Sequence, residues 1–268
     1  MLDRLLPRRT AAGDVLRRVK HRRAAGPPAD PATQPIEAVI EAFGATHPRA
    51  SFVQIGSNDG VRFDPICSQI RTRPWQGVMV EPLPWLFARL EANFGGFRRL
   101  RLENAAIAEQ DGTQVLHHLA PHHGDLGDLP PWYDAIGSFR REVVLSHRDA
   151  IPDIEERLRT TEVRCLTFES LCRAHDVRRI DLVHVDTEGY DRHVLDQVDL
   201  ERWAPAVVLF EHLHLDHVDR AHCVERLAEH GYQTGAGPMD TLAVRRAALD
   251  AHPAVAAAWA LARPNLTI

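Results

Sequence analysis

This sequence lacks the features that mark most membrane, secreted and nucleic-acid-binding proteins. No apolar run approaches the roughly 20 residues that a bilayer-spanning helix requires. The four cysteines form no CxxC pair and follow no secretory signal, which predicts reduced thiols and a cytoplasmic location. A net charge of −5 gives no global reason to expect a nucleic-acid partner. With 268 residues and 44% hydrophobic content, the chain suits one α/β domain with some extra segments.

Composition divides the chain into three parts. Residues 1–35 combine clustered arginines with a proline-rich linker, and we expect a basic N-terminal extension there. No apolar segment follows its charges, so it is not a signal peptide; contact with an anionic membrane or an acidic protein remains open, as does a simple frayed extension. Residues 36–246 form the predicted main domain, with an insertion at about 120–160 that is too long for a plain loop. Residues 247–268 are expected to form a C-terminal helix.

The stretch at residues 51–60 has the form of a buried strand that ends in a ligand-binding turn. Its apolar run through Ile55 contains no glycine or proline, which suits a strand covered on both faces of a parallel sheet. The turn that follows consists of two glycines around three small polar residues: Gly56, Ser57, Asn58, Asp59 and Gly60. Glycine lets the main chain approach a ligand closely, and a strand, a glycine turn and a helix in this order form a crevice at the carboxyl edge of an α/β sheet.

A second strand, at residues 77–80, ends in Glu81 about 20 residues further on. An acidic residue at this distance binds the ribose hydroxyls in dinucleotide folds. The turn at Gly56 lacks the third glycine of the GxGxxG pattern, which disfavours a pyrophosphate and therefore NAD. The two stretches together predict an adenosyl ligand without a diphosphate.

The remaining elements predict a mostly parallel sheet that ends in an antiparallel strand. Strands and helices alternate through residues 51–119 and 180–230, which implies right-handed crossovers. Strands at 232–236 and 241–246 look like a terminal hairpin across a Gly-Pro turn. Asn104 and Ala105 follow the third strand, where the amide of Asn104 can read the edge of a base or simply form a turn.

Acidic and histidine side chains gather after two later strands. The strand at 180–185 is followed by Asp186, Glu188 and Asp191, which can hold a cation, bind a ligand's ammonium group, or favour the N-terminus of the next helix. The strand at 206–210 is followed by Glu211 and His212. In the insertion, Trp132 and Tyr133 either stack on a sugar or ring of the substrate or pin the insertion to the core.

These stretches together resemble the FkbM family of S-adenosyl-L-methionine-dependent methyltransferases. The resemblance rests on IGSNDG with a downstream MVEP, on HVDTEGYD and on VVLFEH, and it covers roughly residues 50–246. It implies a Rossmann-like class I methyltransferase fold and S-adenosyl-L-methionine as cofactor. By the resemblance, residues 56–60 hold the methionine end, Glu81 the ribose, Asn104 and Ala105 lie near the adenine, and Asp186 lies near the amino group or the reaction centre. His184 departs from the family pattern, where a lysine is common.

The resemblance also implies the reaction, which is most simply O-methylation of a hydroxyl on a glycan, lipid or secondary metabolite. The acceptor hydroxyl needs a base, and His212 is our preferred candidate because histidine titrates near neutral pH; His214, Asp186 and Glu211 are further candidates for a catalytic role. One alternative is a metal-assisted reaction with magnesium at Asp186, Glu211 and His212. Another is a non-catalytic nucleotide-binding module.

Overall fold

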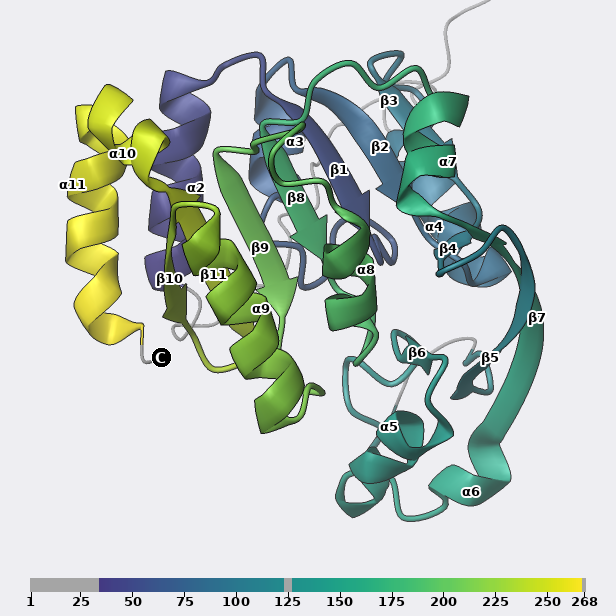
Figure 1. Cartoon of the computed structure of the whole chain (residues 1–268). Coiled ribbons are helices and arrows are strands. Elements are labelled where there is room, and N and C mark those ends of the chain that lie inside the picture. The colour runs from purple at the N-terminus through teal and green to yellow at the C-terminus, as the bar shows by residue number, and fades with distance from the viewer. Residues whose placement is uncertain (1–33, 123–126, 267–268) are drawn as a thin grey trace, which may run out of the picture.

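The computed structural model describes residues 34–122 and 127–266, which form a layered α/β domain with a smaller lobe below it (Figure 1). The predicted basic extension lies outside the described residues except for its last two positions, which begin helix α2 (Gln34–Thr46). Within the described residues, no helix combines the length and the hydrophobicity that a bilayer crossing requires.

A seven-stranded sheet forms the centre of the domain, and all its strands are parallel except one. The antiparallel strand β11 lies between β9 and β10, so it is the last strand in the chain but is not at the edge of the sheet. The expected mostly parallel fold with a final antiparallel strand is therefore confirmed. In spatial order the strands are β10 (Tyr232–Ala236), β11 (Asp240–Arg245), β9 (Val207–Glu211), β8 (Leu182–Val185), β1 (Ser51–Ile55), β2 (Gln76–Val80) and β3 (Leu100–Glu103).

Helices cover both faces of this sheet, because the central strands are apolar on both sides. All residues of β1, β8 and β9 are buried, and neighbouring residues such as Phe52 and Val53 belong to hydrophobic clusters on opposite faces. One face packs against α7 (Phe168–Ala174), α8 (Asp191–Gln197) and α9 (His217–Glu229). The other packs against α2, α3 (Cys67–Thr72), α4 (Pro84–Phe94) and α11 (Pro253–Ala262).

The register of the sheet brings the ends of four strands to one level. Ile55 lies opposite both Val80 and Val185, and Val185 lies opposite Phe210. The residues that follow these positions are Gly56, Glu81, Asp186 and Glu211, so the predicted ligand residues leave the sheet side by side.

The helix after the glycine turn begins at Cys67, although Asp64 and Pro65 are residue types typical of an N-cap and a first helical position. The Asp64 carboxylate accepts the backbone N–H of Ile66 at 2.9 Å and stabilises the turn that precedes the helix. Phe63 is 53% exposed and has a φ of 58°.

A second sheet joins the insertion to the segments on either side of it. Strand β5 (Gly112–Leu119) lies in the segment where alternating strands and helices were expected, but its long partner β7 (Leu158–Leu166) was not foreseen. Most of β7 before Val163 is exposed or half-buried and polar, so no apolar run marks it. The sheet has the order β4 (Ala106–Ile107), β7, β5 and β6 (Gly137–Ser138). Short helices α5 (Arg141–Leu145), η1 (Ser146–Asp149) and α6 (Ile154–Arg157) complete the lobe.

The C-terminal segment is not the single helix expected over residues 247–268. It forms α10 (Arg246–Ala251), α11 and a 3-10 turn, η2 (Arg263–Asn265). The break falls at His252 because a residue before proline avoids the helical conformation, whereas Pro253 readily starts a new helix. The side chain of Trp259 donates a hydrogen bond to Gln233 at 2.8 Å, which holds α11 against the sheet.

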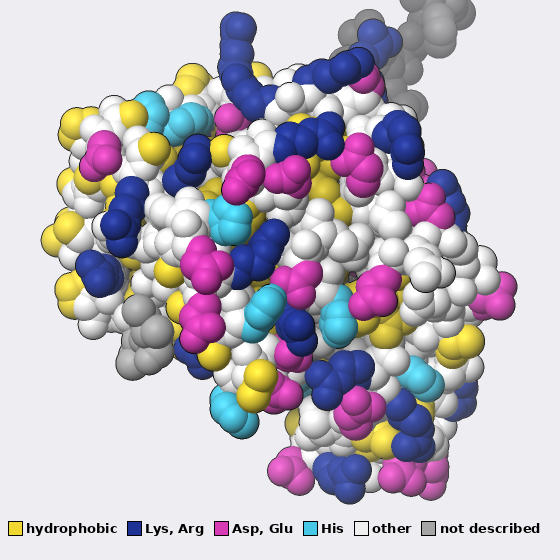
Figure 2. Space-filling model, viewed as in Figure 1, with side chains coloured by type: hydrophobic (Ala, Val, Ile, Leu, Met, Phe, Trp, Pro, Cys, Tyr) yellow, Lys and Arg dark blue, Asp and Glu magenta, His cyan; other side chains and the backbone are white. Residues whose placement is uncertain are grey.

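The surface seen in Figure 2 is mixed in charge. Acidic and basic side chains are interspersed over this face. Ion pairs between surface helices, such as Arg192 Nη1 of α8 with Asp219 Oδ1 of α9 at 2.9 Å, balance charge locally. Charge is therefore balanced locally on this side of the described chain, in contrast to the acidic cavity described next.

Candidate functional site

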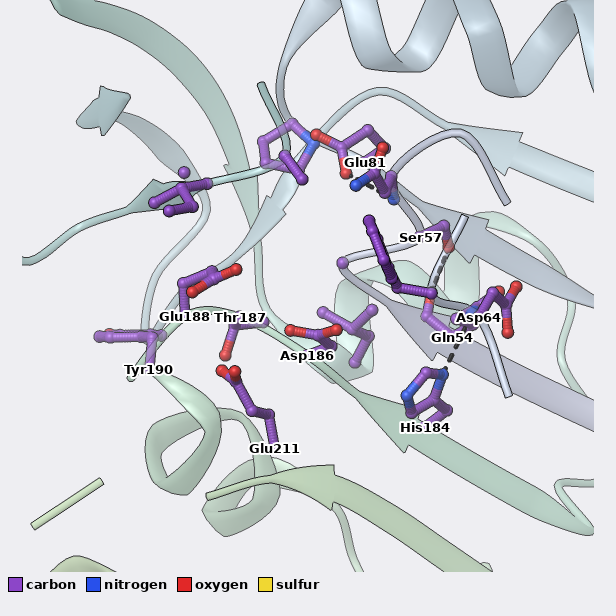
Figure 3. A pocket seen from close by; sticks show the side chains of 18 of the residues that line it. Gln54, Ser57, Asp64, Glu81, His184, Asp186, Thr187, Glu188, Tyr190 and Glu211 are labelled. Carbon is purple, nitrogen blue, oxygen red and sulfur yellow. Dashed lines mark hydrogen bonds between the residues drawn. The ribbon is translucent and has the colours of Figure 1, made fainter. Parts of the chain in front are cut away.

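A cavity of about 650 Å³ lies at the carboxyl ends of β1, β2, β8 and β9 (Figure 3). The insertion contributes one wall, including Trp132 and His147. Seven carboxylates line the cavity, which favours a cationic ligand: Glu37, Asp64, Glu81, Asp186, Glu188, Glu211 and Asp240.

The glycine turn joins the three central strands. The backbone N–H groups of Gly56 and Ser57 both donate to the carbonyl oxygen of Val80, at 3.0 and 2.9 Å. Gly56 has a φ of 79°, and a Cβ at this position would lie 1.6 Å from the carbonyl oxygen of Asp186. Only glycine fits there, and the predicted meeting of the glycine turn with the acidic strand end is observed.

The residues of the turn differ in their orientation. Ser57 and Asn58 line the cavity with Gly56, whereas Asp59 and Gly60 are not among the lining residues. The Asp59 carboxylate instead accepts the backbone N–H groups of Val61 and Arg62, both at 2.9 Å, and stabilises the turn from behind.

Glu81 is buried beside the turn and lines the cavity. Its two carboxylate oxygens accept the backbone N–H groups of Asn58 at 2.9 Å and Leu83 at 2.8 Å. Burial outweighs these two hydrogen bonds and raises the pKa of Glu81 to about 7. Each oxygen retains a lone pair, so the carboxylate is able to accept two further hydrogen bonds from a ligand.

Asn104 and Ala105 have separate roles. The Asn104 amide donates to the carbonyl oxygens of Glu81 at 2.7 Å and Pro82 at 3.0 Å, and Asn104 is not among the lining residues. Of the two interpretations of Asn104, this geometry matches the turn residue. Ala105 does line the cavity.

The acidic residues after β8 also separate into two groups. Asp186 and Glu188 line the cavity, and burial, followed by the charge of Glu188, raises the pKa of Asp186 well above its usual range. Asp191 is fully buried and accepts the backbone N–H groups of Thr187 at 3.3 Å and Gly189 at 3.2 Å. Asp191 therefore stabilises the turn before α8, while the other two remain available to a ligand.

His212 does not reach the cavity. Successive side chains of a strand point to opposite faces, so His212 points away when Glu211 points inward. The His212 ring is buried against Thr241, with Nδ1 2.9 Å from the hydroxyl, and burial lowers its pKa to about 4. His214, two residues later, lines the cavity instead and places Nε2 3.0 Å from Oε2 of Glu188.

Several lining residues had no assigned role in the sequence analysis. Gln54 donates to Nδ1 of His184 at 3.0 Å, and the Gln54 Oε1 and Asp64 Oδ2 atoms are buried without a hydrogen-bond partner among the described residues (Figure 3). A glutamine inside an apolar strand is the one signal that pointed to this pair. His147 comes from the insertion, where its ring lies 5.1 Å from that of His214, and no local pattern marks it.

The insertion is attached to the segments that follow β1 and β8. Arg62 of the glycine turn contacts Asp134 of the insertion at 3.0 Å, and Arg89 of α4 pairs with the same carboxylate. Burial alone would raise the pKa of Asp134, but the two guanidinium groups outweigh it and lower the pKa. The Ser138 hydroxyl donates to the carbonyl oxygen of Glu188 at 2.7 Å.

The two aromatic residues of the insertion have different surroundings. Tyr133 is buried in the insertion's own hydrophobic cluster, with Ile136, Val144 and neighbouring residues. Trp132 lines the cavity and packs against the ring of His147, with 4.9 Å between centroids. Tyr133 therefore stabilises the insertion itself and does not pin it to the central core, whereas Trp132 is available to a ligand.

Comparison with known proteins gives a family match over most of the chain. Residues 54–234 match the family model of the methyltransferase FkbM domain. None of the curated proteins matches the chain. The solved structures that match this chain include a precorrin-6y C5,15-methyltransferase from Geobacter metallireducens GS-15 (14% identity, 82% of this chain and 93% of that chain, TM-score 0.41). They also include a methyltransferase FkbM from Methylobacillus flagellatus KT (12%, 87% and 60%, 0.44) and an O-methyltransferase from Bacillus cereus in complex with SAH (11%, 90% and 93%, 0.40).

Proposed function

Because this chain belongs to the FkbM family of methyltransferases, we propose that it transfers a methyl group from S-adenosyl-L-methionine to a hydroxyl of a glycan, lipid or secondary metabolite. The observation that carries this proposal is the acidic cavity that the ends of β1, β2, β8 and β9 share. The acceptor approaches from the insertion side, where Trp132 provides an aromatic surface for a sugar or ring.

The lining residues fit the proposed cofactor. Gln54 Oε1 and Asp64 Oδ2 are buried acceptors without partners, and they suit the ammonium group at the methionine end. Glu81 suits the ribose hydroxyls, and Ala105 suits a flat base. The absence of a Cβ at Gly56 allows the turn to pack on β8 and leaves the cavity open beside it.

Charge and position together account for the chemistry. S-adenosyl-L-methionine supplies a methyl group activated by a positively charged sulfonium. Asp186 and Glu211 surround the adjoining part of the cavity with negative charge, which favours binding of that cation. Alignment of an acceptor oxygen with the methyl carbon is worth up to about 7–11 kcal/mol, so the walls of the cavity contribute most by fixing the acceptor.

His214 is the base that the geometry favours in place of His212. As the acceptor oxygen forms its bond to the methyl carbon, the carbon–sulfur bond breaks, S-adenosylhomocysteine is the leaving group, and the acceptor proton passes to His214. Glu188, 3.0 Å from the His214 ring, orients it and stabilises the imidazolium that results.

Calorimetry and an acceptor panel test this function. We expect S-adenosylhomocysteine to bind the purified protein with one site per chain, and at least one hydroxylated glycan, lipid or polyketide-like acceptor to be methylated. Absence of binding heat with both the cofactor and its demethylated product contradicts the proposal. Binding without methylation of any acceptor favours a non-catalytic nucleotide-binding module.

A further inference from the structure

Three carboxylates converge at the centre of the cavity. One oxygen from each of Asp186, Glu188 and Glu211 lies within 4.8 Å of the others. These side chains come from the end of β8, the following turn and the end of β9, and Figure 3 shows them directed toward a common space. Three negative charges at this separation repel one another strongly in a partly dehydrated site, so a cation there would stabilise the arrangement.

Glu211 is an independent indication of a missing ligand. It is only 8% exposed, and its Oε2 atom is buried without a hydrogen-bond partner among the described residues. The nearest basic group to its other oxygen is His214 Nε2, at 3.9 Å, beyond hydrogen-bond distance. A carboxylate buried in this way is costly unless it is paired or coordinates a metal.

Two neighbouring buried carboxylates, Glu81 and Asp191, do not share this property. Glu81 accepts two backbone N–H groups, and Asp191 accepts the N–H groups of Thr187 and Gly189. The fold thus provides a backbone donor for each oxygen of these two carboxylates. Glu211 faces the other two acidic side chains instead, and the hydroxyl of Thr187 beside them is also buried without a partner.

We propose that Asp186, Glu188 and Glu211 bind one divalent cation. In an octahedral site with bonds of about 2.1 Å, adjacent ligand atoms lie about 3.0 Å apart and opposite ones about 4.2 Å, so oxygens already within 4.8 Å need little movement. Oxygen ligands of this kind select Mg²⁺ or Mn²⁺ over Zn²⁺. His212, included in the set expected from sequence, is bound to Thr241 and is not a ligand.

The position of the cation defines its role and the class of acceptor. Its role, unlike its binding, rests on the proposed methyl transfer. An acceptor hydroxyl that coordinates the cation becomes more acidic, so its proton is released more easily to His214. Glu188 has one oxygen 3.0 Å from His214 and a second oxygen for the cation. Acceptors with two adjacent oxygens, such as vicinal diols or hydroxy ketones, chelate a cation and are therefore the preferred class.

Manganese binding to the full-length protein tests the site directly. We expect chelator-treated protein to bind one Mn²⁺ per chain, measured by electron paramagnetic resonance, with competition by Mg²⁺. Glu211→Gln keeps the shape of the side chain and should weaken Mn²⁺ binding at least tenfold. The control is Glu103→Gln at the end of β3, whose carboxylate pairs with Arg164 and His175 and should not affect Mn²⁺ binding. Wild-type protein that binds no Mn²⁺, or a Glu211→Gln variant that binds it equally well, overturns the proposal.

A second measurement needs no variant and separates this inference from the proposed function. Bound Mn²⁺ should broaden the proton resonances of S-adenosylhomocysteine in complex with the wild-type protein, and Mg²⁺ should not. S-adenosylhomocysteine that binds in excess EDTA while Mn²⁺ fails to bind removes the metal site and leaves the methyltransferase assignment intact. Mn²⁺ that binds while the nucleoside does not removes the cofactor assignment instead.

Discussion

Glu81 allows a test in which a single buried carboxylate controls both stability and cofactor affinity. It is 4% exposed, and its pKa rises from 4.5 to about 7 because burial outweighs two backbone hydrogen bonds. The folded protein therefore holds a proton that the unfolded chain releases between pH 4.5 and about 7. The stability that accompanies this proton is fully present below the lower value and is lost as the pH rises through the upper one.

The magnitude follows from the size of the pKa difference. Each pKa unit corresponds to about 1.36 kcal/mol, so Glu81 should destabilise the ligand-free protein by about 3 kcal/mol at alkaline pH relative to acid pH. Glu81→Gln cannot ionise. It loses one backbone hydrogen bond, at a cost of about 1–3 kcal/mol that does not depend on pH. The unfolding free energy of the variant, relative to that of the wild type, should therefore increase by about 2–3 kcal/mol between roughly pH 5 and pH 8.

Urea unfolding of both proteins at the two pH values measures this difference. Other groups with shifted pKa values, such as Asp64 and His184, titrate equally in both proteins and cancel in the comparison. A free-energy difference between variant and wild type that stays constant with pH refutes the raised pKa of Glu81.

The affinity for the cofactor should rise with pH, whereas the stability that Glu81 contributes falls with pH. If the ionised form of Glu81 accepts the ribose hydroxyls, protonation competes with binding, and S-adenosylhomocysteine should bind about tenfold more weakly at pH 6 than at pH 8. Calorimetry should find this dependence reduced in Glu81→Gln, together with an overall loss of about 1–3 kcal/mol. Equal affinity of both proteins at pH 8 contradicts the ribose assignment.

Three further experiments, two of them with a paired control variant, test the rest of the site. His214→Gln should lower kcat by about 10²–10⁴-fold with little change in cofactor affinity. His212→Gln should lower the melting temperature and leave kcat nearly unchanged. A large loss of kcat in His212→Gln but not in His214→Gln would restore His212 as the base. Gly56→Ala should destabilise the fold by more than about 4 kcal/mol, seen as loss of soluble protein. The control is Gly96→Ala, because a Cβ at Gly96 would lie in open space. Equal melting temperatures of the two variants contradict the close contact at Gly56. Asp134→Asn should lower the unfolding free energy by about 1–3 kcal/mol. The loss should be smaller than on breaking a fully buried ion pair, because both arginines are partly exposed. An unchanged melting temperature rules out Asp134 as an anchor of the insertion.

The sequence predicted the central sheet well because burial there is uniform. Strands such as β1 and β8 are covered on both faces, so all their residues are buried and most are apolar. The strands can therefore be recognised as apolar runs in the sequence. Parallel pairing then places strand ends together, which is why the proximity of Gly56 and Asp186 could be foreseen.

Features that depend on side-chain direction or on long-range packing could not be predicted in this way. Glu211 and His212 are adjacent, and only the alternation of the strand through Glu211 decides that the carboxylate faces the cavity and the imidazole does not. His147 lines the cavity because the insertion is held against the turns after β1 and β8 by Asp134 and Ser138. The polar strand β7 is stabilised by eight residue pairs with β5 rather than by its own hydrophobicity, so its sequence resembles a loop.

The two anchors of the insertion have an evolutionary consequence. Asp134 pairs with Arg62, which follows the glycine turn, and Ser138 binds the turn after β8, while the rest of the lobe is supported by its own hydrophobic cluster. Mutations elsewhere in the lobe can therefore accumulate without shifting these two turns. Relatives that preserve both anchors are free to diversify in what they methylate, and exchange of the lobe between them should transfer acceptor preference.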